Sequence, residues 1–262
     1  MVKNNTQILN DSVPSAFDAT LDKTNKIHKI NNLTNSDIYN YILQNSHRHI
    51  NYFWLGRRDY HEAWDIQKNI QDDIKNNNIN GVILFLEHNS IYTLGKNADS
   101  SNVLPTKSLN MPVVKTDRGG DVTYHGPGQL VGYPIIDLKQ YRKSITWFMR
   151  GLENSIITML DSIDIDSSTK SNLTGVWVED KKIAALGVRL SRWVSMHGFA
   201  INVFTDMTQF NGIVPCGISD FGLTSILKLK SKEYSLFDIA LKMTTPLSQL
   251  FKKPRTTERI HA

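Results

Sequence analysis

The pattern of apolar and polar side chains predicts a strand, a helix and a buried strand in succession from residue 51 onward. Residues 52–55 are aromatic or aliphatic, which favours a strand. Asp59 and Glu62 have the spacing of a capping box, so a helix is expected to begin there. Apolar residues recur at helical spacing until Asn76, and the run 82–86 that follows is apolar throughout. That run predicts a strand buried on both faces.

Shorter extended segments and two more helices are predicted along the rest of the chain. Strands are expected at 113–114, 122–124, 130–133, 175–178, 183–190 and 199–203. One helix is predicted over 145–160 from its apolar stripe, and another begins at Ser235, capped with Asp238. A turn at 179–181 joins two of the strands as a hairpin, so antiparallel pairing is expected in this half. The fold class is therefore α/β, with a mixed, largely antiparallel sheet flanked by helices.

The two ends of the chain differ in composition from its middle. Residues 1–48 are rich in Asn, Ser, Thr and Asp and show no apolar periodicity, which predicts a loosely ordered extension. Residues 49–251 form the expected catalytic domain, and 252–262 a polar tail. The extension has acidic residues and no Arg before Arg48, unlike a mitochondrial transit peptide. A cytoplasmic location is expected, with the mitochondrial matrix as the alternative.

Composition narrows the classes of function. Of the 262 residues, 40% are apolar and 21% charged, which is typical of a globular protein with a sizeable core. The most apolar run is far shorter than the ~18 residues that a membrane span needs, so no membrane partner is expected. The net charge of +5 comes without a cluster of basic and aromatic residues, which argues against nucleic acid. One Cys and eight scattered His predict neither a disulfide nor a metal site, and no cofactor is expected.

Cys216 and Lys182 are the first candidates for chemistry. Cys216 stands between Pro215 and Gly217, in a loop suited to aiming a side chain, although an isolated Cys is more often buried and inert. A nucleophilic Cys needs a base or cation that favours its thiolate. Lys182 opens the apolar run 183–187, where it either points into a pocket or extends its ammonium to solvent from a buried stem. Spacing alone leaves both alternatives open.

A glycine-rich segment at 118–129 is the second candidate. Its four glycines permit close approach of the backbone to a ligand, and the alternative is a tight hairpin loop. The segment lacks the Gly-Lys-Ser/Thr of a phosphate-binding loop and the strand-then-helix context of a dinucleotide site. His88 and His197 are each a possible general base or a hydrogen-bonded core histidine. The sequence does not decide between these roles.

Taken together, these segments resemble the lipoyl(octanoyl) transferase family. The resemblance extends over residues 51–226. Its segments are Leu55-Gly56, Asp59-Tyr60, Leu86-Glu87-His88, Tyr92-Thr93-Leu94-Gly95, Arg118 to Gln129, Gly175-Val176-Trp177-Val178, Lys182 to Arg189, His197 to Asn202, and Pro215-Cys216-Gly217-Ile218. Asn89 departs from the family, in which many members have Pro, and this puts the shape of that one loop in doubt.

The resemblance implies a fold, a site and partners. The implied fold is the catalytic domain shared with biotin- and lipoate-protein ligases, and the implied catalytic residues are Cys216, as acyl-thioester nucleophile, and Lys182. The implied substrate-binding residues are Arg118, Gly119, Gly120, Asp121, Val122, Thr123, Tyr124, His125, Ala185, Leu186, Gly187, Gly198, Phe199 and Ala200. The implied donor is octanoyl-acyl carrier protein. The implied acceptors are lipoyl domains of 2-oxoacid dehydrogenase E2 subunits and the glycine-cleavage H protein.

Two other functions fit parts of the same pattern. An ATP-dependent lipoate- or biotin-protein ligase would use the glycine-rich segment to hold an adenylate and would need no Cys. A non-catalytic module would bind an acyl carrier without transfer. The pairing of Cys216 with Lys182 favours the transferase.

Overall fold

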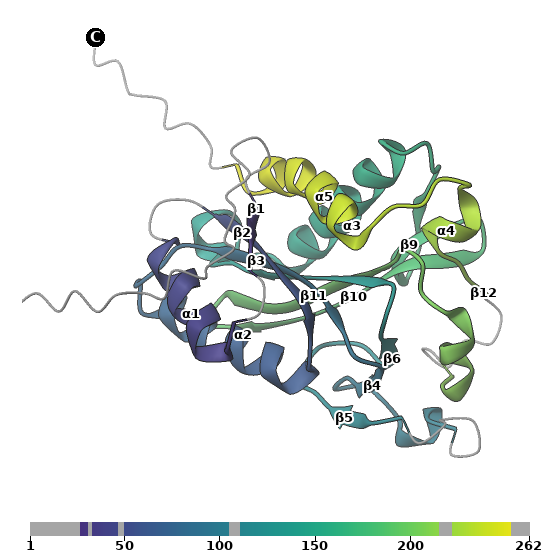
Figure 1. Cartoon of the computed structure of the whole chain (residues 1–262), viewed down its shortest axis with the longest axis horizontal. Coiled ribbons are helices and arrows are strands. Elements are labelled where there is room, and N and C mark those ends of the chain that lie inside the picture. The colour runs from purple at the N-terminus through teal and green to yellow at the C-terminus, as the bar shows by residue number, and fades with distance from the viewer. Residues whose placement is uncertain (1–26, 31–32, 47–49, 105–110, 215–221, 253–262) are drawn as a thin grey trace, which may run out of the picture.

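The computed structural model describes residues 27–30, 33–46, 50–104, 111–214 and 222–252. Within them, nine strands form one mixed sheet (Figure 1). In spatial order along the main path these are β1 (Ile27–Lys29), β2 (Asn51–Arg58), β3 (Val82–His88), β7 (Gln129–Ile135), β11 (Val194–Asn202), β10 (Lys181–Ser191), β9 (Leu173–Val178) and β8 (Ser168–Lys170). The ninth strand, β12 (Gly222–Leu223), pairs with β10. The predicted largely antiparallel sheet is confirmed, since only the β1–β2, β2–β3 and β10–β12 pairs of this sheet are parallel among the described residues.

A smaller sheet carries the glycine-rich segment. Its strands are β5 (Val113–Lys115), β4 (Ile91–Leu94) and β6 (Val122–His125), in that order. In the described ranges, three short 3₁₀ helices accompany the sheets: η1 (Ser100–Asn102), η2 (Leu138–Gln140) and η3 (Met207–Gly212). Side chains of β4 and β6 form a separate apolar cluster with Phe210 of η3, which fixes the small sheet against that helix.

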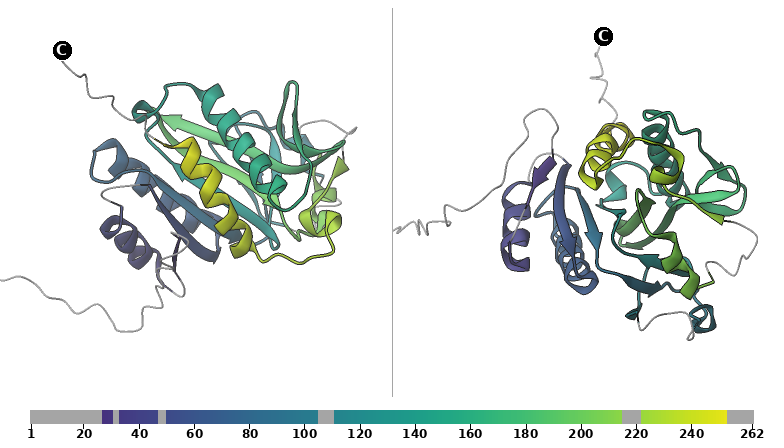
Figure 2. Two further views of the ribbon diagram at one scale, coloured as in Figure 1. Left: turned by 90° about the horizontal axis from the view of Figure 1, so that it is seen from above. Right: turned by 45° about the vertical axis from the view of Figure 1, so that its right-hand side comes forward.

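Helices cover both faces of the large sheet (Figure 2). α1 (Asn35–Gln44) and α2 (Tyr60–Lys75) pack on one face, and α3 (Ile145–Asp161) and α5 (Leu236–Leu250) on the other. The short α4 (Ile226–Leu229) follows β12. Among the described residues, no helix is both long enough and apolar enough to span a membrane.

Local sequence explains where the helices begin. Asp59 caps α2, but its carboxylate accepts from the backbone N–H of His61, at 2.8 Å, rather than forming the expected box with Glu62. Ser235 and Asp238 do form the predicted capping box at the start of α5. Ile145 was expected within the buried stripe of α3 and is instead half exposed, because it stands at the first residue of the helix.

The expectation that residues 1–48 are loosely ordered is wrong for the described part of that stretch. β1 pairs with β2, and the side chain of Ile27 is fully buried. Ile38 and Ile42 of α1 are also fully buried, in the cluster that includes the apolar face of α2. These two residues are four apart and share one helix face, a signal that is short and surrounded by Asn and Ser. The folded unit therefore begins before residue 49.

Candidate active site

A cavity of about 440 Å³ lies between the glycine-rich segment and strands β10 and β11. Of the predicted site residues, Lys182 and all the predicted substrate-binding residues except Tyr124 line it. Tyr124 contributes instead to the apolar cluster under the small sheet, and its hydroxyl lies 3.1 Å from Ser90 Oγ. Side chains alternate along a strand, so Thr123 and His125 face the cavity while Tyr124 points the other way.

Glycines allow the 118–120 segment to lie directly on β10. The Gly119 N–H donates to Val188 O at 2.9 Å. A Cβ atom at Gly187 would stand 2.7 Å from Gly119 O, and one at Gly95 would stand 2.2 Å from Gly120 O. Gly120 has a φ of +92°, which side chains rarely tolerate. These contacts explain why glycine is needed at Gly120 and at the two positions that the segment packs against, and how the segment forms one wall of the cavity.

Arg118 anchors that wall. Its guanidinium is buried and donates to Thr93 O at 2.7 Å, to Thr93 Oγ1 at 2.9 Å and to Gly119 O at 3.1 Å. A buried guanidinium is stable only when such acceptors satisfy its donors. Arg118 therefore ties the glycine-rich segment to β4.

Lys182, near the start of β10, forms part of the cavity wall opposite the glycine-rich segment. Its stem passes Gly175, where a Cβ would come within 3.1 Å of Lys182 Cε, and its Nζ lies 4.7 Å from the centre of the Trp177 ring. Gly175 has a φ of +136°, so glycine gives both the backbone shape and the room for the lysine. In the described part of the chain, no carboxylate lies within ion-pair distance of Lys182. Its ammonium is thus available to an anion in the cavity.

Cys216 lies outside the described residues, but the chain on both sides of its segment is described. On the near side, Val214 N donates to Asn102 O at 2.8 Å. On the far side, Gly222 and Leu223 pair with Lys181 and Lys182 in the β10–β12 ladder. The chain therefore leaves the Cys216 segment directly beside Lys182.

Three buried histidines lie near the other end of the cavity. Burial lowers the pKa of His88 to about 4, and burial with the neighbouring His88 lowers the pKa of His125 to about 3. Burial also lowers the pKa of His197, against the effect of its 2.8 Å hydrogen bond to Asp117. Groups that stay neutral in this way are poor bases at neutral pH. The geometry favours the core interpretation of His88 and His197.

Several cavity residues were not singled out as site residues from sequence. They are Tyr60, Gln129, Tyr133, Ile145, Met149, Asn172, Leu173, Thr174, Val188, Asn202, Phe210 and Leu223. Gln129 ends the glycine-rich motif and Asn202 lies within the predicted strand 199–203, so both belong to segments that the sequence patterns single out. Tyr60 and Val188 also lie in segments of the resemblance. The others come from helices, strands and a turn distant in the sequence, whose meeting point only the fold determines.

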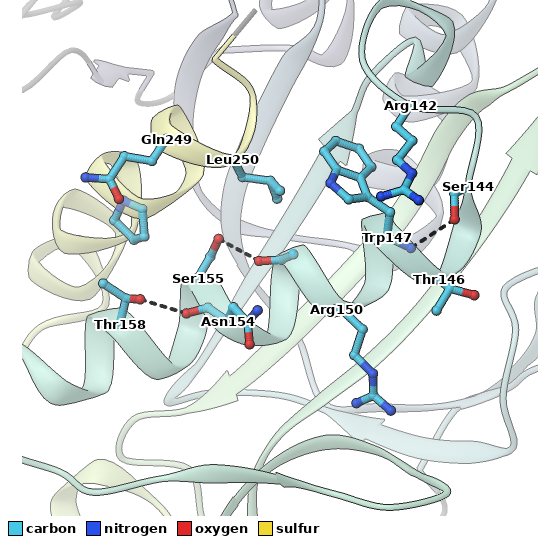
Figure 3. A pocket seen from close by; sticks show the side chains of 12 residues that line it. Arg142, Ser144, Thr146, Trp147, Arg150, Asn154, Ser155, Thr158, Gln249 and Leu250 are labelled. Carbon is cyan, nitrogen blue, oxygen red and sulfur yellow. Dashed lines mark hydrogen bonds between the residues drawn. The ribbon is translucent and has the colours of Figure 1, made fainter. Parts of the chain in front are cut away.

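A second hollow, of about 530 Å³, lies between α3 and α5 (Figure 3). It contains none of the predicted site residues. Two of its hydroxyls are used within α3: Ser155 donates to Gly151 O at 2.8 Å and Thr158 to Asn154 O at 2.9 Å. The groups suited to acyl chemistry therefore gather in the first cavity.

Residues 59–247 match the model of the lipoyl protein ligase A/B catalytic domain family. The chain belongs to this family. Among curated relatives, the octanoyltransferase of Christiangramia forsetii is 41% identical over 219 residues, which cover 76% of this chain and 94% of that protein. A chloroplastic octanoyltransferase of Arabidopsis thaliana is 41% identical over 221 residues, covering 77% and 79%. The predicted resemblance to octanoyltransferases is confirmed, and the chain is an acyltransferase.

Solved structures show the same fold at low sequence identity. A bipartite lipoate protein ligase from Thermoplasma acidophilum matches with a TM-score of 0.58 and 13% identity, over 77% of this chain and 84% of that one. Biotin protein ligase from Aquifex aeolicus matches with a TM-score of 0.50 and 19% identity, over 76% and 69%. The predicted fold of the ligase family's catalytic domain is thereby confirmed. Among the described residues, no group of His, Cys, Asp and Glu could hold a metal ion.

Proposed function

We propose that this chain transfers an octanoyl group from acyl carrier protein to a lysine of a lipoyl domain, through a thioester on Cys216. The family assigns the chain to acyl transfer, with an acyl donor and lipoyl-domain acceptors in general. The single observation that supports the covalent route is the position of Lys182. Its ammonium lines the cavity, has no carboxylate partner among the described residues, and stands beside the chain that leaves the Cys216 segment.

The first half-reaction loads the enzyme. The Lys182 ammonium favours the Cys216 thiolate, which attacks the carbonyl of the acyl thioester. The bond between the carbonyl carbon and the donor sulfur breaks, and the donor thiolate takes a proton from Lys182. The products are the octanoyl-enzyme, the free donor thiol and a neutral Lys182. Apolar side chains such as Leu186, Phe199 and Met149 provide the cavity wall that an alkyl chain requires.

The second half-reaction unloads it. Neutral Lys182 takes a proton from the ammonium of the acceptor lysine, and the resulting amine attacks the octanoyl-enzyme. The carbon–sulfur bond breaks, Cys216 leaves as a thiolate beside the restored Lys182 ammonium, and the second amine proton passes to solvent. An amide replaces a thioester, so this step drives the sequence forward.

The partners and location follow from the same proposal. The donor is octanoyl-acyl carrier protein, and the acceptors are lipoyl domains of 2-oxoacid dehydrogenase E2 subunits and of the glycine-cleavage H protein. The thiol must stay reduced, for which we propose the cytoplasm, with the mitochondrial matrix as the alternative.

Intact-mass spectrometry tests this function. Purified wild type incubated with octanoyl-acyl carrier protein should gain one octanoyl group on Cys216. Cys216→Ala should gain none and should lose transfer by a factor of about a thousand or more, with an unchanged circular dichroism spectrum. A wild type that needs ATP to modify the acceptor would instead indicate a ligase. A wild type that binds the carrier but forms no adduct and no product would indicate a binding module.

A further inference from the structure

A series of buried hydrogen bonds runs along the lining of the cavity. It connects the glycine-rich segment to β10, the strand that carries Lys182. It begins at His125, whose Nδ1 lies 2.8 Å from Gln129 Oε1. Gln129 Nε2 donates to Asn202 Oδ1 at 3.0 Å, and Asn202 Nδ2 donates to Thr224 O at 3.1 Å. The Thr224 N–H then donates to Lys182 O at 3.1 Å. Gln129, Asn202 and Thr224 are each at most 4% exposed.

The carbonyl oxygen of Thr224 determines the direction of each side-chain hydrogen bond in this series. The carbonyl of Thr224 can only accept, so Asn202 must present its NH₂ there and its oxygen to Gln129. Gln129 must then donate to Asn202, and it also donates to Tyr124 O at 3.2 Å, which leaves its oxygen for His125. His125 is therefore protonated on Nδ1. We call the hydrogen bonds from His125 to Lys182 the brace. Because none of its side-chain amides can be reversed, the brace holds its residues in a single arrangement.

Asn202 is the member that joins the two walls. On one side it holds Gln129 and, through it, His125 of the glycine-rich segment. On the other it holds Thr224, the second residue after Gly222, and so the chain that emerges from the Cys216 segment next to Lys182. Lys182, Asn202, Gln129 and His125 all line the same cavity. The brace would act by holding these groups in place, and this role requires no proton transfer along its hydrogen bonds.

We propose that Asn202 is a positioning residue for acyl transfer, which sets the placement of Lys182 and the Leu223–Thr224 chain relative to the glycine-rich wall. The inference rests on the proposed Cys216 route. Misplacing reacting groups by about 1 Å can cost two orders of magnitude in rate. Breaking the brace should therefore slow acylation while leaving the cavity, and hence substrate binding, largely as it is.

The test is Asn202→Leu, which keeps the branched shape and the number of heavy atoms of the side chain and removes both hydrogen bonds without adding charge. Cys216 acylation by octanoyl-pantetheine, followed in single turnovers by intact mass, should slow by at least about tenfold. The steady-state KM for that thioester should change less than about threefold, a split between rate and binding that general loosening would not produce.

Gln71→Met is the matched control. Gln71 is also buried, and its Nε2 donates to a backbone carbonyl, Val194 O, at 3.0 Å at the opposite end of β11. It should lower Tm as Asn202→Leu does and leave the acylation rate at the wild-type value. Should Asn202→Leu not fold, Gln129→Met breaks the brace one bond further from Thr224 and should slow acylation in the same way.

Two outcomes would overturn the proposal. One is a folded Asn202→Leu enzyme that is acylated at the wild-type rate. The other is a loss of rate in Gln71→Met equal to that in Asn202→Leu, which would show that any buried hydrogen bond of β11 has this effect. Failure of the Cys216 route itself looks different, because the wild type would then show no octanoyl adduct.

Discussion

Strand β10 presents a cation at each of its ends, and the two are held differently. At the far end, Arg189 Nη1 lies 2.6 Å from Asp117 Oδ2, and the other oxygen of Asp117 lies 2.8 Å from His197 Nε2. At the first end, the ammonium of Lys182 lies over the face of the Trp177 ring. No carboxylate among the described residues forms an ion pair with it. The fold neutralises one cation and leaves the other for the cavity. This difference agrees with a structural role for Arg189 and with the catalytic role that we propose for Lys182.

The surroundings of the two ends reinforce this difference. Near His197, the rings of Tyr60, His88, His125 and Tyr133 pack against one another, with Tyr60 and His125 stacked at 6.0 Å. Near Lys182, β10 is bordered by β9 on one side and on the other by the short β12, which follows the Cys216 segment in the chain. Packed aromatic rings surround the Arg189 end, and the Lys182 end adjoins the chain that follows the segment of the proposed nucleophile.

Replacing Lys182 should produce the largest effect. Lys182→Met keeps much of the apolar stem and removes the ammonium, so acylation of Cys216 and overall transfer at pH 7 should fall by about a hundredfold or more. The rate of Cys216 alkylation against pH should shift toward higher pH, because the thiolate loses its counter-charge. Single-turnover acylation and iodoacetamide titration measure the two.

Lys181→Met is the control for that experiment, since Lys181 is the exposed neighbour on the same strand. It should behave as wild type in both measurements. If Lys182→Met also titrates and transfers as wild type, the lysine only extends its ammonium to solvent, and the contrast between the two ends of β10 disappears.

Acid should lower the free energy of unfolding through the buried histidines near the Arg189 end. Burial holds the pKa of His88 at about 4 and that of His125 at about 3, below the ordinary 6.5. Below pH 6.5 the unfolded chain therefore binds protons that the folded chain does not, and stability is lost as pH falls toward these values. Each histidine should lower the free energy of unfolding by up to about 1.4 kcal/mol per pH unit in that window. Urea titrations between pH 7 and 5 measure this slope.

His88→Gln tests the assignment of that slope. It removes one titrating ring, so the fall in stability between pH 6.5 and 5 should be smaller than in wild type by about one histidine's share. Equal slopes in the two proteins would mean that His88 is not held neutral by its burial.

Breaking the ion pair between Asp117 and Arg189 should have the smallest effect. Burial would raise the pKa of Asp117, but its hydrogen bond to His197 and the charge of Arg189 hold that pKa below its ordinary value. Asp117→Asn should lower the free energy of unfolding by about 1 kcal/mol, because Asp117 and Arg189 are about one-third exposed and solvent screens them. Acylation of Cys216 should change less than about threefold. A hundredfold loss would place Asp117 in the chemistry and refute the contrast.

Sequence patterns predicted the elements with strong periodicity and the residues carried by a motif. The buried strand at 82–86 and the helix from Asp59 follow from local rules, and the structure has both. The helix α1 was missed because its apolar stretch is short and lies between Asn- and Ser-rich residues, and Ile38 and Ile42 become part of a core only against α2. Tyr124 was placed in the site because it lies in the motif, although strand alternation turns it away. The connection of Asn202 to Thr224 joins residues 22 positions apart and exists only in the folded chain.

The strand β1 has a consequence for how the protein can be shortened. It pairs with the outer edge of β2 through Ile27, His28 and Lys29, and Ile30 N adds a hydrogen bond to Trp54 O at 2.9 Å. A chain trimmed to the family-matched residues 59–247 would lose β1 and β2 and leave β3, apolar on both faces, as an open edge. Unpaired apolar edges recruit strands from other molecules. A chain trimmed in this way is therefore expected to aggregate, and the residues ahead of the matched region are needed to cover that edge.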